Sequence, residues 1–102
     1  MLDVWDLTKL MEFSQAQRVK KEVCKTKWFN VVLVCLDSGQ EIPPRPEPYD
    51  VCFYVIDGSG TFTVGSEQVD LSRGKMILAP ANVARGIRSK ERLALLGVQE
   101  RH

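Results

Sequence analysis

Turn-forming residues divide this chain at short intervals, and their spacing constrains the fold more than any other feature of the sequence. Clusters of Gly, Pro, Asp, Asn and Ser recur roughly every 8–12 residues, at 37–39, 57–60, 65–66, 72–74 and 80–82. Such intervals hold one short strand and are too short for helices that alternate with parallel strands. The sequence therefore predicts an all-β domain, either a sandwich or a small barrel.

Most segments between these turns are rich in β-branched, aromatic and aliphatic residues, which favour strands. The predicted strands occupy 18–26, 28–36, 51–56, 61–64, 68–71, 76–79, 83–89 and 93–99. Four prolines hold 42–48 extended and deny it regular ladder bonds. Asp6 is expected to cap a short helix over 7–13. We expect one domain over 1–102, with an N-terminal helical segment at 1–17 and barrel strands over 18–100.

Two predicted strands, 28–36 and 93–99, are apolar at nearly every position and so are expected to be buried on both faces. One barrel of 102 residues would leave one of these faces uncovered. We therefore expect a homodimer that buries a strand or the N-terminal segment, with Leu2 and Trp5 packed on the barrel or on the second subunit. Light scattering that shows only the 11.5 kDa monomer would contradict this expectation.

Two blocks of glycines and prolines are more specific than the strand pattern. In the first, five residues separate Gly39 from Arg45-Pro46-Glu47, three separate Glu47 from Val51, and six separate Val51 from Gly58. In the second, Gly74 is followed after five residues by Pro80, and then by Asn82, Arg85 and Ser89. The spacing and order of both blocks resemble the two motifs of the cupin superfamily over about residues 28 to 99. The resemblance implies a small double-stranded β-helix, the RmlC-like jelly-roll barrel, with a short N-terminal helix here.

The resemblance places the metal-ligand positions of the family at Arg45, Glu47, Val51 and Arg85. A charged guanidinium offers no lone pair to a metal, and Val51 offers no donor at all. The only histidine of the chain is His102, in a tail expected to fray. We therefore expect no bound metal, no cofactor and no catalytic residue, since tight transition-metal sites need three or four ligands.

The same resemblance implies that the side chains at these four positions point into the barrel. Strand alternation places Phe53 and Val55 on the same face as Val51. The predicted ligand pocket is Arg45, Glu47, Val51, Phe53 and Arg85. One interpretation is structural: Glu47 forms an ion pair with Arg45 or Arg85, and the pair fills the space that the metal occupies in the resembled family. The other is functional, with an arginine gripping a carboxylate or phosphate. Arg45 facing water is a further alternative.

Three hypotheses for function follow from this pocket. The preferred one is a metal-free domain that binds a small molecule, with anions among the candidates, or serves as a non-catalytic sensor or accessory protein. The second is an enzyme with atypical metal ligands, such as Glu47 with Cys35 or Cys52. The third is a regulatory or assembly subunit that uses the barrel only as a scaffold.

Charge and cysteine content narrow the class of protein further. The net charge of +1 provides no general attraction to nucleic acid or an anionic membrane. The basic run over 18–27 is interpreted as a solvated strand. Residues 1–13 lack the pattern of a signal peptide, so we expect a cytoplasmic protein with no nucleic-acid or membrane partner. The three cysteines are widely spaced and are expected to be reduced.

Overall fold

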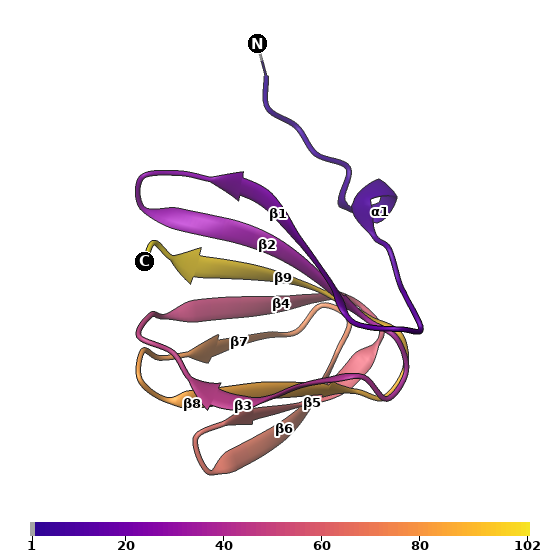
Figure 1. The fold of residues 1–102 in the computed structure, drawn as a ribbon, viewed down its shortest axis with the longest axis vertical. Helices are drawn as coiled ribbons and strands as arrows, with labels where there is room; N and C mark the ends of the chain where they lie inside the picture. Colours follow the sequence, from indigo (N-terminus) through magenta and orange to yellow (C-terminus); the bar gives the residue numbers. More distant parts are fainter. Residues whose placement is uncertain (1) are drawn as a thin grey trace.

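Nine strands form two antiparallel sheets that face each other in the computed structural model, which describes residues 2–102 (Figure 1). One sheet has five strands in the order β1-β2-β9-β4-β7, and the other has four in the order β3-β8-β5-β6. The strand bounds are β1 Val19–Lys25, β2 Phe29–Leu36, β3 Glu41–Pro46, β4 Val51–Asp57, β5 Ser59–Val64, β6 Glu67–Ser72, β7 Met76–Ala79, β8 Ala84–Ser89 and β9 Leu93–Glu100. The all-β barrel predicted from the sequence is confirmed.

The proline-rich stretch departs from the expectation that it makes no regular ladder. It forms an edge strand, β3, that pairs with β8 through Glu41 and Ile42 and again through Arg45 and Pro46. The register shifts between Ile42 and Arg45, so the ladder is interrupted at the two intervening prolines. An edge strand tolerates prolines because its other side needs no partner.

The helix is shorter than predicted and covers only Leu7–Leu10 (α1). Asp6 caps it as expected, because its carboxylate accepts hydrogen bonds from the backbone N–H groups of Thr8 and Lys9. The prediction to residue 13 was wrong, since the chain turns extended at Met11, with φ −60° and ψ 132°. This extended course lets Phe13 pack against the outer face of the large sheet.

Strand β2 is buried on both faces, as predicted. Its residues Val32 and Val34 face the other sheet and join the main core with Phe62. Leu33 and Cys35 face outward, and the N-terminal segment covers them through Leu10, Met11 and Phe13. The N-terminal segment therefore provides part of the cover that the sequence assigned to a second subunit.

Part of the outer surface stays apolar and exposed. Leu2 is 87% exposed and Trp5 45%, in an arm that leaves the barrel near β1, so neither is buried on its own barrel (Figure 1). Met76 and Leu78 on β7 are also exposed. The homodimer expected from the sequence stays a prediction. Among residues 2–102, no helix has the length and apolar character to cross a membrane.

Two turns bring the motif blocks together. Asn82 occupies the position where the resembled motif has glycine, and its φ of 67° is one that Asn tolerates better than most residues. Its backbone N–H donates to the carbonyl of Glu47 over 2.7 Å. The Asp50 carboxylate accepts from the N–H of Ala81, also over 2.7 Å. These bonds fix the end of the first block against the start of β8.

Candidate ligand pocket

A pocket of about 530 Å³ opens between the two sheets, and all five residues predicted from the sequence line it. Strand β4 contributes Val51 and Phe53, β8 contributes Arg85, β3 contributes Arg45, and Glu47 follows β3. The volume lies in the range of small-molecule sites. Sequence and structure thus converge on one pocket, while its occupant stays a prediction.

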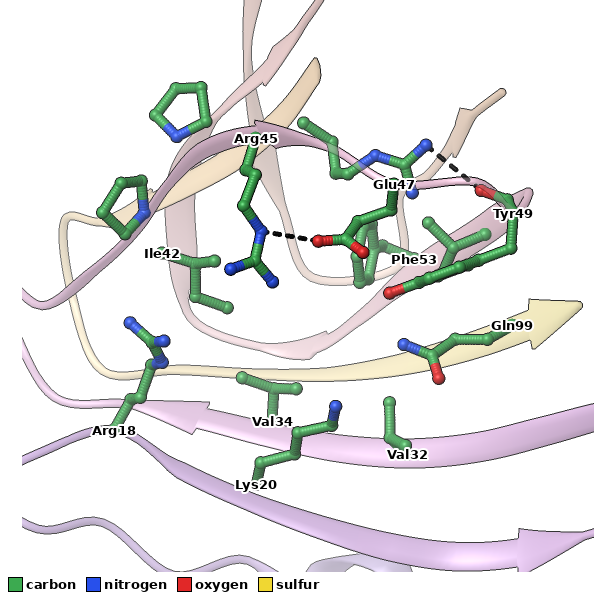
Figure 2. A pocket seen from close by; sticks show the side chains of 14 residues that line it. Arg18, Lys20, Val32, Val34, Ile42, Arg45, Glu47, Tyr49, Phe53 and Gln99 are labelled. Carbon is green, nitrogen blue, oxygen red and sulfur yellow. Dashed lines mark hydrogen bonds and ion pairs between the residues drawn. The ribbon is translucent and has the colours of Figure 1, made fainter. Parts of the chain in front are cut away.

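The rest of the lining divides into an apolar wall and a polar set. The apolar wall adds Val32, Val34, Ile42, Pro43 and Pro44. The polar set, which was not included in the predicted pocket, is Arg18, Lys20, Tyr49 and Gln99. Figure 2 shows Arg18 and Lys20 toward one end, near Val34 and Ile42, and Tyr49 and Gln99 toward the other.

The strongest polar feature of the pocket is Arg85, which is only 7% exposed. Its Nε donates to the carbonyl of Val83 over 2.9 Å, and its Nη2 donates to the carbonyls of Tyr49 and Pro80 over 3.1 and 2.6 Å. Its Nη1 is buried and has no hydrogen-bond partner in the described part of the chain. The guanidinium is therefore held in place by backbone carbonyls, and its remaining nitrogen has no protein acceptor among residues 2–102.

Arg45 and Glu47 form an ion pair of their own, with 2.6 Å between Nε and Oε1 (Figure 2). The Arg45 side chain is 79% exposed and that of Glu47 is 21% exposed. Of the two partners considered for Glu47, the structure therefore shows Arg45 and not Arg85. The expectation that Arg45 faces water also agrees with its exposure. A pair with one exposed partner adds little stability, typically about 0–1 kcal/mol.

Tyr49 packs beside the buried guanidinium, with the Arg85 Cζ 5.4 Å from its ring centroid. Burial raises the pKa of the Tyr49 hydroxyl, and the nearby Glu47 carboxylate raises it further, against smaller lowering effects of Arg85 and Arg45. The ring of His102 stacks on Tyr49 with centroids 3.9 Å apart. The tail expected to fray is therefore placed against the loop that carries Tyr49.

The charges of the lining are unbalanced. Four side chains are cationic and Glu47 is anionic. Of these five groups, only Arg45 and Glu47 take part in a salt bridge within residues 2–102. Arg18 instead donates to the carbonyl of Glu41 over 3.1 Å. The pocket thus has an excess of positive charge and an apolar wall, which together suit an anion with an apolar body.

The donor set does not fit the metal that many barrels of the resembled family hold. Of the four corresponding positions, only Glu47 carries a metal-ligating group, and its carboxylate is paired with Arg45. No cluster of three His, Cys, Asp or Glu side chains suited to a metal occurs among residues 2–102. The hypothesis of a metal held by Glu47 with Cys35 or Cys52 does not agree with the geometry, since neither cysteine lines the pocket. Cys35 lies on the outer face of the large sheet beneath the N-terminal segment, because β2 alternates its faces.

The two facing sheets and the pocket between them define a small barrel of the double-stranded β-helix class. The chain belongs to the Cupin_2 family, whose cupin domain matches residues 32–98. This assignment confirms the resemblance drawn from the two glycine and proline blocks.

Similar proteins support the family and the fold. An uncharacterised protein of Streptomyces coelicolor is 34% identical over 55 residues, a match that spans 54% of this chain and about half, 52%, of that protein. A protein of Thermus thermophilus has a TM-score of 0.91 at 24% identity, with 97% of each chain covered. An RmlC-like cupin from Desulfovibrio desulfuricans has a TM-score of 0.89 at 21% identity, covering 98% of this chain and 97% of that one. KdgF from Halomonas has a TM-score of 0.78 at 24% identity, covering 86% and 83%.

Proposed function

We propose that this protein binds a small anionic molecule in its barrel pocket and acts through that binding, as a metal-free sensor or accessory protein. The observation that carries the proposal is Arg85, a buried cation that has no carboxylate partner among residues 2–102 and whose Nη1 has no protein acceptor there. Burying a charge is costly unless it is paired, so an anionic occupant would remove this cost. The apolar wall then holds the body of the ligand out of water.

Ligand binding of this kind stabilises the folded state in proportion to the logarithm of the free ligand concentration, once that concentration exceeds the Kd. An anion present at about a hundred times its Kd adds about 2.7 kcal/mol of unfolding free energy, or about 10 °C in Tm for a chain of this size. The test is a thermal-shift titration with benzoate, hexanoate and phenyl phosphate at constant ionic strength. We expect at least one of them to raise Tm, with chloride as the reference anion.

Two arginine variants separate the pocket from a general effect of charge. Arg85→Gln removes the buried cation and is expected to abolish the shift. Arg88→Gln makes the same change of charge on the same strand, but Arg88 is exposed and lies outside this pocket, so it should retain the shift. No shift with any of the anions, or equal shifts in both variants, would contradict the proposal.

A further inference from the structure

The cations of the pocket lie in two groups. Arg85 lies beside Tyr49, with its Cζ 5.4 Å from the Tyr49 ring centroid. Figure 2 shows Tyr49 and Gln99 toward one end of the pocket, and Arg18 and Lys20 on the side of Ile42 and Val34. The strand register supports this separation. Lys20 pairs with Val34 on β2, whereas Gln99 pairs with Asn30, four residues away on the same strand. At the rise of a β-strand, these two rows are about 13 Å apart.

The floor between the two groups is apolar. Val32 lies on the row between Lys20 and Gln99, and its neighbours across β9 are Gly97 and then Phe53. Because Gly97 has no side chain, Val32 and Phe53 form a continuous surface there. A ligand that reaches from one charged group to the other must therefore cross apolar side chains.

Neither Arg18 nor Lys20 is neutralised by a carboxylate within residues 2–102, since the four salt bridges involve Lys21, Arg45, Lys90 and Arg92. The neighbouring Lys21 shows the contrast, because it points to the other face of β1, where it pairs with Glu12 over 3.0 Å. Two unpaired cations at one end and one at the other, separated by an apolar floor, match a ligand with an acidic group at each end.

Building on the proposed function, we propose that the occupant is an elongated dianion, with one acidic group on Arg85 and the other between Arg18 and Lys20. Its two acidic groups are joined by an apolar linker that lies on Val32 and Phe53. Carboxylates and phosphates share the required chemistry, since both accept hydrogen bonds from guanidinium and ammonium groups.

The test compares matched pairs of acids by calorimetry at neutral pH. Each α,ω-dicarboxylate from succinate to azelate is paired with the monocarboxylate of equal carbon number, such as adipate with hexanoate. A pocket with one cationic end would prefer the monocarboxylate, because its far end is apolar. The proposal predicts the opposite order, with adipate or one of its longer homologues bound about tenfold more tightly, which corresponds to one charge-assisted contact. A diphosphonate of the preferred length tests which acidic group is favoured.

Substitutions locate the second acidic group. The Arg18→Gln/Lys20→Gln double variant is expected to lower the ratio of dicarboxylate to monocarboxylate affinity to about one. Lys25→Gln, on the same strand but outside the pocket, controls for the loss of charge and should leave that ratio unchanged. Circular dichroism verifies that each variant is folded.

The outcomes separate the two proposals. If no dicarboxylate from adipate to azelate binds more tightly than its paired monocarboxylate, the second acidic group is refuted and the proposed function stands. If the ratio of dicarboxylate to monocarboxylate affinity is unchanged in the double variant, or falls equally in Lys25→Gln, the placement of the second acidic group between Arg18 and Lys20 is refuted. If no mono- or dianion binds, the proposed function itself fails.

Discussion

Strands β3 and β8 carry two arginines that pair directly across the ladder, yet the two side chains have opposite environments. Arg45 lies on the edge strand, is 79% exposed and has a carboxylate partner. Arg85 lies on a strand flanked by β3 and β5, is 7% exposed and is held only by backbone carbonyls. Like charges opposed across a ladder repel each other, and here the two guanidinium groups are bonded to different partners.

This contrast shows that place in the sheet, rather than residue type, decides what an arginine can do. The edge arginine satisfies its charge locally and can interact with water. The central arginine has no carboxylate partner among residues 2–102, so no acidic side chain there neutralises its charge. The different environments of the two arginines depend on the close packing of β3 against β8. A substitution that separates these strands tests this dependence.

The largest effect is expected from Gly86→Ala, which separates the two strands. A Cβ at Gly86 would lie 2.7 Å from the backbone N of Pro44 and 2.9 Å from the carbonyl oxygen of Ile42. Backbone atoms cannot move aside as a side chain can, so β3 must shift away from β8. We expect a loss of about 2–3 kcal/mol of unfolding free energy, at the upper end of the range for overpacking, measured by urea denaturation.

Gly97→Ala is the matched control for that change. A Cβ at Gly97 would meet side-chain atoms, with Val32 Cγ2 at 3.0 Å and Phe53 Cε1 at 3.2 Å. These groups border the pocket and can give way, so the expected loss is smaller, about 1 kcal/mol. Equal losses in the two variants would show that β3 is not held by its close approach to Gly86.

An intermediate effect is expected when the charges of the Arg45–Glu47 pair are removed one at a time. Glu47→Gln should raise the affinity for benzoate about two- to fivefold, because it removes the only carboxylate of the lining. Arg45→Gln should lower the affinity by a similar factor, and by less than Arg85→Gln, because Arg45 is exposed. The measurement is calorimetry at low ionic strength.

Glu67→Gln provides the control, since Glu67 is exposed on β6 and does not line the pocket. A change of the same sign in both Glu47→Gln and Arg45→Gln would contradict this account, because it would show that the pair acts as a unit and not as two opposed charges.

The fold could be predicted from local signals that tolerate little variation. Gly58 shows why, because its φ is 85° and a Cβ there would lie against the carbonyl of Arg92. Asn82 shows the permitted departure, since its short polar side chain allows a positive φ. The metal-ligand positions of the motif led to four of the five predicted pocket residues, and strand alternation led to Phe53; all five line the same pocket of the barrel.

The other polar residues of the pocket could not be predicted, because their place depends on contacts between distant segments. Arg18 and Lys20 look like part of a solvated basic run along the chain. Only the pairing of β1 with β2 brings Lys20 opposite Val34, and alternation then turns Lys20 toward the pocket and Lys21 away. Lys20, Lys21 and Glu22 are consecutive charged residues on alternating faces of β1, so the charge pattern alone did not indicate which of them would face the pocket. The partners of Arg85 likewise come from loops that only the folded barrel joins.

The smallest expected effect tests the neighbourhood of the buried arginine through Tyr49. Burial and Glu47 raise the pKa of its hydroxyl above the ordinary value near 10. As the pH rises through about 10, the unfolded chain loses this proton more readily than the native state does, so stability contributed by Tyr49 is lost. Tyr49→Phe should therefore show a shallower decline of the urea midpoint above about pH 10 and none of this difference near pH 8. Tyr54→Phe is the control, because Tyr54 is 44% exposed and lies outside the pocket. An equal change of slope in both variants would show that the environment around Arg85 does not favour the neutral form of Tyr49.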